Sequence, residues 1–299
     1  MRIVIAGGTG FLGRPLAAAL QSDVHEVVLL SRSGGAPGTV VWNPDGTAGP
    51  WASIVDGAGA VINLAGESIA GRRWSAAHKR RILDSRVDAT RSLAAAIGKA
   101  AAPPPIFVSG SAVGYYGPRG EDALTEEAKP GDDFLARVCV AWETEARRAQ
   151  SDRTRVVCIR TGLVLEKDGG ALPQMLPPFW FGAGGPVGSG RQYWAWIHRA
   201  DWIAMVTWAI ATPGVAGPIN ATAPTPETNR DFARALGRAM HRPAVMPAPA
   251  FALRLLLGEM ADALLLSGQR AVPANCQRLG FAFQYPTLDA ALAAIFEKR

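Results

Sequence analysis

The stretch RIVIAGGTGFLG, residues 2–13, decides the fold. Four of its first five residues are apolar and the run is of β type, Gly7, Gly10 and Gly13 follow, and a helix is predicted from about residue 10. A tight turn from strand to helix needs glycine for positive φ, and a pyrophosphate must approach its backbone closely. The N–H groups and the positive dipole end of the helix then bind that anion. The stretch therefore predicts a dinucleotide-binding turn, with a purely structural turn as the alternative.

Short apolar runs alternate with longer helical patterns through the first half of the chain. The runs are EVVLL (26–30), TVVW (39–42), AVINLAG (60–66), PIFVSG (105–110) and RVVCIRTGLVL (155–165), and the helical patterns cover about 75–99 and 132–149. Near-continuous apolar strands between helices indicate a parallel sheet that is covered on both faces. This alternation predicts an α/β fold with a doubly wound Rossmann parallel sheet.

The second half of the chain has a different composition. A glycine-rich segment (182–192) precedes the tryptophan-rich WAWIHRADW (194–202), and helices are expected at about 227–240, within 243–266 and at 287–296. Asp201 is expected to cap the helix that follows WAWIH. We expect a Rossmann domain over 1–170, with return segments from about 195–222, and a smaller C-terminal α/β region on the substrate side over 171–299.

The composition bounds the class of protein. The chain has 299 residues, 48% of them hydrophobic, and a net charge of +6. It has no run of the roughly 18 apolar residues that span a bilayer, and its N-terminal apolar stretch is too short for a secretory signal. Because no run could span a bilayer, we expect no membrane partner, and because the basic residues are scattered, we expect no nucleic-acid partner. Three separated cysteines in apolar contexts predict reduced core thiols and no metal site. These features indicate a cytoplasmic protein.

The end of the second predicted strand decides between two forms of the dinucleotide. A carboxylate there would accept hydrogen bonds from the adenosine ribose. This chain has Leu29-Leu30-Ser31-Arg32-Ser33 instead, with a hydroxyl group and a guanidinium but no acid. Because arginine makes bidentate charge-assisted bonds to phosphate, the site suits a 2′-phosphate. NADP(H) is therefore predicted over NAD(H), unless Arg32 is merely a solvated loop residue.

Two further segments fit a dinucleotide and its substrate. AVINLAGE (60–67) ends a predicted strand in small residues, as expected where backbone lies alongside a dinucleotide. Arg86 on the following helix could reach a phosphate or a ribose, and a surface position is an equal alternative. The 182–192 segment is suited to closing over a polar substrate, and a flexible connection is its alternative.

Several motifs together resemble the extended short-chain dehydrogenase/reductase superfamily, of the NAD-dependent, nucleotide-sugar epimerase type. They are GGTGFLG (7–13), LLSRS (29–33), INLAGE (62–67), VSGSAVGYYG (108–117) and IRTGLVL (159–165). GEMAD (258–262) and YPTL (285–288) are similar to an atypical branch with a small C-terminal domain of unknown function. The resemblance covers essentially the whole chain and implies an NADP(H)-binding Rossmann domain without naming a substrate.

The resemblance also implies roles for individual residues. Gly7, Thr9, Gly10, Phe11, Leu12 and Gly13 would contact the pyrophosphate, and Ser31 and Arg32 would hold the 2′-phosphate. Leu64 and Ala65 would line the adenosine side, Glu67 and Arg86 would lie near the cofactor, and Leu163 would face the nicotinamide.

The proton-transferring pair of the superfamily is missing. Its members use a serine after the fifth strand, for which Ser111 is the first candidate and Ser109 the second, together with a Tyr-x-x-x-Lys pair on the next helix. The pair is needed because a phenol near its reference pKa of about 10 is a poor base at neutral pH. Depending on register, this chain has Leu135 and Cys139, or Phe134 and Val138, at those two positions.

Other residues could replace the pair. Tyr116, or its neighbour Tyr115, could supply a phenol from the other side of the pocket, or both could simply pack with one hydroxyl bonded to backbone. Glu67 follows a cofactor-lining strand and is a second acid/base candidate. His198 is expected to be structural, and Cys139 is expected to be an inert thiol.

These observations predict an NADP(H)-binding oxidoreductase or epimerase-like enzyme. Its substrate would be a small hydroxylated or carbonyl compound, with sugar-like compounds among the candidates. Ser111 would orient the substrate oxygen, and Tyr116 or Glu67 would transfer the proton. The alternative is a non-catalytic NADP(H)-binding protein that acts as a sensor or scaffold. The oligomeric state is left open.

Overall fold

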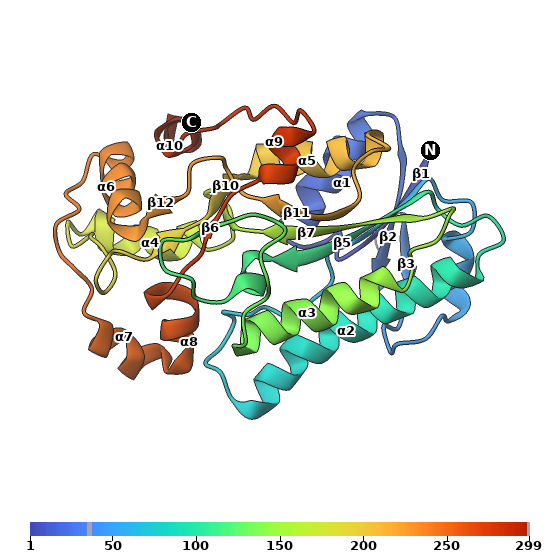
Figure 1. Cartoon of the computed structure of the whole chain (residues 1–299), viewed down its shortest axis with the longest axis horizontal. Coiled ribbons are helices and arrows are strands. Elements are labelled where there is room, and N and C mark those ends of the chain that lie inside the picture. Colours follow the sequence, from blue (N-terminus) through green and yellow to red (C-terminus); the bar gives the residue numbers. More distant parts are fainter. Residues whose placement is uncertain (35–37, 298–299) are drawn as a thin grey trace.

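A seven-stranded parallel sheet forms the centre of the molecule in the computed structural model, which describes residues 1–34 and 38–297 (Figure 1). Its strands, in the spatial order β11-β7-β5-β4-β1-β2-β3, are β11 (Gly217–Ala221), β7 (Arg155–Thr161), β5 (Ile106–Ala112), β4 (Ala60–Asn63), β1 (Arg2–Ala6), β2 (Glu26–Ser31) and β3 (Thr39–Val41). The chain leaves β1 first toward β2 and then toward β4, so the direction of winding reverses beside β1. Ligands of such sheets bind at the carboxyl ends of the strands at this reversal. The predicted doubly wound fold is confirmed.

Helices cover both faces of the sheet, as Figure 1 shows. Helices α1 (Gly13–Ser22) and α5 (Arg199–Ala211) lie on one face, and α2 (Ala76–Lys99) and α3 (Phe134–Arg147) lie on the other. Successive side chains of β1 alternate between the two cores: Ile3 and Ile5 pack on the α1 side, and Val4 on the α2 side. Because both faces of the strand are buried, its sequence is continuously apolar.

Polar side chains fix where these helices begin. Ser75 accepts a hydrogen bond from the backbone N–H of His78 at 3.2 Å at the start of α2, and Asp133 accepts one from Ala136 at 2.8 Å at the start of α3. Each side chain satisfies an amide group that has no partner within the helix.

The start of α5 differs from the sequence-based expectation. His198 caps this helix, because its Nδ1 accepts a hydrogen bond from the N–H of Ala200 at 3.0 Å. The prediction that Asp201 is the cap is therefore wrong. The buried Asp201 carboxylate instead accepts hydrogen bonds from the N–H groups of Gln284 and Tyr285, at 2.7 and 2.9 Å. It thereby fastens the C-terminal segment to the Rossmann sheet.

The remaining elements form the smaller region and its connections. Three short strand pairs are β8 (Leu163–Leu165) with β10 (Trp196–His198), β9 (Tyr193–Trp194) with β12 (Glu227–Thr228), and β6 (Ala123–Leu124) with β13 (Arg270–Ala271). The helices are α4 (Leu172–Trp180), α6 (Asn229–Met240), α7 (Ala250–Leu257), α8 (Glu259–Ala261), α9 (Ala274–Arg278) and α10 (Leu288–Glu297). Helices α4, α6 and α10 share a separate apolar core that includes Leu176, Phe232 and Leu292. The exact domain boundary stays a prediction.

The structure also bears on the membrane-spanning segments, metal sites and cysteines that the composition raised. Within residues 1–34 and 38–297, no helix combines the length and the apolar character that crossing a bilayer requires. The same part of the chain holds no cluster of three or more side chains suited to a metal ion. Cys139, Cys158 and Cys276 are buried and free, and burial raises the pKa of each thiol to about 12.

Candidate functional site

The turn between β1 and α1 is closed by contacts that only glycine allows. Gly7 has a φ of +78°, and a Cβ atom there would lie 2.6 Å from the carbonyl carbon of Leu64. A Cβ at Gly13 would lie 2.2 Å from the carbonyl oxygen of Gly7. Leu12, the N-cap of α1, has no polar side chain to occupy the amide groups of the first turn. No side chain therefore caps this end of α1, which lies beside the winding reversal, and helix N-termini of this kind suit a bound anion.

The loop after β8 packs against this turn. The Phe11 side chain packs against the backbone of the loop after β8, since Cβ atoms at Gly169 and Gly170 would lie 2.5 and 2.8 Å from its ring. The Arg199 guanidinium lies 5.3 Å from the centre of the Phe11 ring and pairs with Glu166 at 3.1 Å and with Asp168. The loop that carries these acids is therefore held against the candidate cofactor turn.

The predicted adenosine side lies where β2 and β4 end. Ser31 closes β2, and its Oγ accepts a hydrogen bond from the N–H of Ser33 at 3.3 Å, whereas Arg32 is exposed. Leu64 donates its N–H to the Ala6 carbonyl at 2.8 Å, which places the backbone after β4 directly beside the glycine turn. Asn63 fixes the backbone of Ala65, because the Asn63 Oδ1 accepts a hydrogen bond from the Ala65 N–H at 3.1 Å.

Arg86 points inward rather than toward the open edge of the sheet. Its Nη1 donates to the carbonyl oxygens of Glu67 and Ile82, both at 3.0 Å, and its guanidinium lies 5.2 Å from the centre of the Trp142 ring. Burial lowers the pKa of Arg86. This residue therefore fixes the backbone of the turn after β4. Glu67 itself is half-buried, with its N–H bonded to Ser85 Oγ at 2.9 Å.

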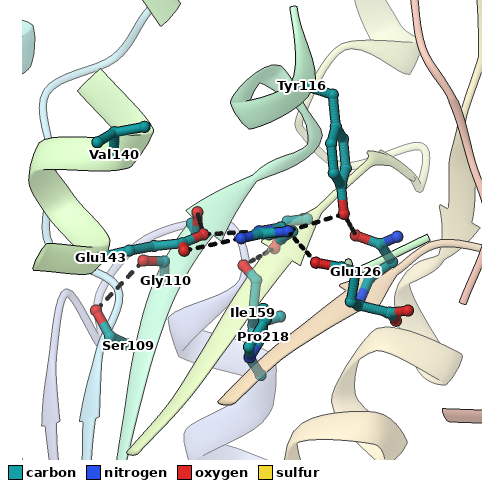
Figure 2. Close-up of polar contacts among 12 residues, drawn as sticks. Ser109, Gly110, Tyr116, Glu126, Val140, Glu143, Ile159 and Pro218 are labelled. Atoms are coloured by element: carbon teal, nitrogen blue, oxygen red, sulfur yellow. Dashed lines mark hydrogen bonds and ion pairs between the residues drawn. The ribbon is translucent and has the colours of Figure 1, made fainter. Parts of the chain in front are cut away.

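Ser111, near the end of β5, bonds to Glu143, the centre of a buried ionic network, and Figure 2 labels Glu143. The Ser111 side chain is 4% exposed, and its hydroxyl donates to Glu143 Oε1 at 2.8 Å. Arg160 donates to both carboxylate oxygens of Glu143, at 2.8 and 3.0 Å, and Arg147 adds a bond of 2.8 Å. The carboxylate accepts four charge-assisted or hydroxyl bonds, which offsets the cost of burying it. Ser109 is also buried and donates to the Gly110 carbonyl.

Tyr116 extends the same network away from the sheet edge. The residue is 0% exposed; its hydroxyl donates to Asn220 Oδ1 at 2.7 Å and accepts from Arg160 Nη1 at 3.0 Å, and Figure 2 shows it pointing at these partners. Burial, opposed by the Arg160 charge, raises the pKa of Tyr116 to about 12. The Tyr115 ring lies against the Arg160 guanidinium at 3.5 Å. Tyr116 is therefore an internal side chain, and the partly buried Tyr115 packs its ring on Arg160.

Helix α3 carries no phenol and no ammonium along its length. Leu135 packs near Gly114 of the turn after β5, where a Cβ would lie 3.4 Å from the Leu135 Cβ. Cys139 is buried beside Ser111, and burial and the Glu143 charge raise the pKa of its thiol to about 12. A thiol with this pKa stays protonated at neutral pH and does not act as a base.

The nicotinamide side is expected near Leu163. The N–H of this half-buried residue donates to the Ala195 carbonyl at 2.7 Å, which joins the end of β7 to the strand that leads into α5. The His198 ring lies 4.0 Å from the Tyr285 ring, centre to centre, in addition to its capping bond. The 182–192 segment is paired with the chain before α7, through bridges from Gly184 to Ala244 and from Val187 to Ala248.

Sequence reasoning missed the residues that organise the network. Arg160 had a visible signal, because a charged residue inside the apolar strand RVVCIRT predicts a buried partner. Glu143 and Asn220 gave no such signal, since their partners lie far away in the sequence. Lys79, which pairs with Glu259 of α8 and so links α2 to the smaller region, was also missed.

A doubly wound sheet with a glycine turn at its reversal point defines an α/β protein of the Rossmann class. The sequence model of the NAD-dependent epimerase/dehydratase family matches residues 3–221, and that of a domain of unknown function matches 248–295. The chain belongs to the NAD-dependent epimerase/dehydratase family. The resemblance seen in the motifs is thereby confirmed.

Individual relatives agree with this assignment. The epimerase family protein MT2273 of Mycobacterium tuberculosis is 43% identical over 293 residues, covering 97% of this chain and 96% of the relative. The crystal structure of human epimerase family protein SDR39U1 (isoform 2) with NADPH superposes with a TM-score of 0.93 at 38% identity, covering all of both chains. The nucleoside-diphosphate sugar epimerase from Corynebacterium glutamicum superposes with a TM-score of 0.82 at 35% identity, covering 99% of this chain and 58% of that one.

Proposed function

We propose that the chain binds NADP(H) at the turn between β1 and α1. The support is the shape of the turn, where Cβ atoms at Gly7 and Gly13 would fill the space against neighbouring backbone. The exposed Arg32 at the end of β2 offers a cation to a 2′-phosphate, and no acid stands there. The human relative, 38% identical, was crystallised with NADPH.

The cofactor residues expected from the sequence are part of this proposal. The pyrophosphate would be held by Gly7, Thr9, Gly10, Phe11, Leu12 and Gly13, the 2′-phosphate by Ser31 and Arg32, the adenosine by Leu64 and Ala65, and the nicotinamide by Leu163. Arg86 would act through the turn that it braces. When bound, the nicotinamide would accept or donate a hydride.

We further propose an oxidoreductase or epimerase-like reaction on a small hydroxylated or carbonyl compound, with sugar-like compounds among the candidates. Of Ser111, Tyr116 and Glu67, only Glu67 is retained as the proton carrier. Tyr116 is enclosed, and its raised pKa keeps the phenol protonated. The Ser111 hydroxyl donates its hydrogen bond to Glu143, so it would accept a hydrogen bond from a substrate hydroxyl rather than donate one.

This proposal is tested by turnover in the NADP⁺- or NADPH-loaded protein with pooled hydroxylated and carbonyl metabolites under anaerobic conditions. We expect a change in nicotinamide absorbance that falls by about 10²–10⁴-fold in Glu67→Gln, with cofactor affinity unchanged. The exposed Glu127→Gln is the matched control and should react as the wild type does. Equal turnover in Glu67→Gln would remove Glu67 from the mechanism.

A second candidate function is a non-catalytic NADP(H) sensor or scaffold. Two observations favour it. Ser111 and Tyr116 spend their hydrogen bonds on partners inside the protein, and α3 has Leu135 and Cys139 where the superfamily has its tyrosine and lysine. Tight NADPH binding without turnover on any substrate pool would support it. The cytoplasmic location, and the absence of nucleic-acid partners, stay predictions.

A further inference from the structure

Large apolar side chains are exposed at one end of the molecule. They are Trp180 and Phe181 at the end of α4, Val245 and Met246 before α7, and Phe251, Leu255 and Leu256 on α7, and we call them the apolar end face. Phe181 is 86% exposed and Leu255 is 79% exposed, and α7 buries none of its eight residues. Single exposed apolar residues are ordinary, but a group of them on neighbouring segments marks an interaction surface.

The segments that carry the apolar end face are joined to one another. The chain after α4 pairs with the chain before α7 at Gly184–Ala244 and Val187–Ala248. A Cβ atom at Gly185 would lie 2.1 Å from the carbonyl oxygen of Met246, so the two segments are in direct contact. Figure 1 shows α4, α6 and α7 at the same end of the molecule, on the left. The seven side chains therefore belong to one end of the fold.

This end also carries a net positive charge. Residues 230–257 contain five arginines and one aspartate, a net charge of +4, while the whole chain carries +6. Two adjoining hollows of about 480 and 590 Å³ place these cations beside apolar residues: Trp180, His241 and Arg242 line the first, and Arg242 and Val245 line the second.

Some of the arginines are already paired within the protein. Arg238 pairs with Asp289 at 2.6 Å, and Arg254 pairs with Asp262 at 2.9 Å. Arg230 and Arg242, by contrast, have no carboxylate partner among the residues that the structure describes. Their charge is available to an external anion.

The chemistry of the face decides between possible occupants. In a symmetric dimer the same surface meets itself, so the cations would oppose each other. A peptide helix needs a groove lined by apolar side chains. Of the seven side chains of this face only Trp180 and Val245 line a hollow, and the other five are exposed outside both hollows. Projecting Trp, Phe and Leu side chains among arginines match the boundary of a bilayer that bears anionic headgroups.

We propose that the apolar end face docks the protein on the surface of an anionic phospholipid bilayer. Trp180, Phe181 and Leu255 enter the boundary between headgroups and acyl chains, and Arg230 and Arg242 contact lipid phosphates. The protein lies on the membrane and does not cross it, in keeping with the lack of a spanning helix among the described residues. The sequence-based expectation of no membrane partner considered spanning segments, and this proposal revises it.

The test is sedimentation of the full chain with vesicles of phosphatidylcholine alone or mixed equally with phosphatidylglycerol. We expect binding to the mixed vesicles only, weakening as salt is added. The double variant Phe181→Ser/Leu255→Ser should lose at least about tenfold in partitioning, and Arg242→Glu should lose about tenfold. Val24→Ser, in an exposed apolar residue on the turn between α1 and β2, is the control and should bind as the wild type does.

Several results would overturn the proposal. One is failure to sediment with the mixed vesicles, and another is equal binding to neutral vesicles. A third is wild-type binding by both sets of variants. A fourth is a lipid-free dimer in analytical centrifugation that becomes monomeric in Phe181→Ser/Leu255→Ser, which would make the face an interface between copies. The circular dichroism spectrum of each variant separates loss of binding from loss of fold.

Discussion

Two regions at the carboxyl edge of the same sheet are built in opposite ways. The turn after β1 is rich in glycine, and no side chain caps the first turn of the helix that follows it. The end of β5 is rich in polar side chains, yet Ser111 and Tyr116 bond to Glu143, Asn220 and Arg160 inside the protein. The first region leaves room for a ligand, whereas the polar groups of the second form their hydrogen bonds within the protein. Cofactor binding and proton chemistry can therefore be separated in this fold.

The largest effect is expected from a substitution that disrupts the buried ionic network of the second region. Arg160→Met would leave Glu143 buried without its main cation, and removing one partner of a buried ion pair costs about 3–5 kcal/mol. We expect the free energy of unfolding in urea to fall by that amount. The double variant Glu143→Leu/Arg160→Met should recover part of the loss, because no uncompensated charge remains. A single variant within about 0.5 kcal/mol of the wild type would contradict the proposed structural role.

The next effect sharpens what the glycine turn requires. Gly7→Ala places a Cβ in a left-handed conformation, which costs about 1–2 kcal/mol, and close to the Leu64 backbone, which adds to the loss. We expect a melting temperature lower by about 2–8 °C. Gly10→Ala is the matched control, since its nearest atom lies at 3.4 Å. It should keep the wild-type melting temperature, and equal losses in both variants would refute this reading of the turn.

A smaller effect separates a packed tyrosine from a catalytic one. Tyr116→Phe removes two hydrogen bonds and should cost about 1–2 kcal/mol, with unchanged NADPH affinity. Because the pKa of Tyr116 is raised to about 12 in the folded protein, its protonated form stabilises the fold fully below the unfolded pKa of about 10. That contribution is lost as the pH rises from about 10 to 12.

The wild type and Tyr116→Phe should therefore become closer in stability across this alkaline range. Urea unfolding at several pH values measures the difference, and comparison of the two proteins cancels the contribution of the cysteines. A constant difference at all pH values would show that the hydroxyl does not titrate in the way its burial implies.

The sequence predicted what local pattern determines and missed what distant contacts determine. The glycine turn, the parallel sheet and its two covered faces follow from spacing within short windows, so they could be read directly. The hydrogen bonds of Ser111 and Tyr116 depend on partners that are distant in the sequence. Glu143 lies 32 positions after Ser111, and Arg160 and Asn220 lie 44 and 104 positions after Tyr116. Asp201 was misassigned as a cap because its true partners, Gln284 and Tyr285, come from the far end of the chain.

The central claim is that the turn after β1 seats a dinucleotide whose 2′-phosphate meets Arg32. Calorimetric titration of the purified chain with NADPH and with NADH tests it most directly. We predict tighter binding of NADPH, a loss of about 10- to 100-fold for NADPH in Arg32→Glu, and little change for NADH. No heat of binding with NADPH, or equal losses for both nucleotides in Arg32→Glu, would contradict the account.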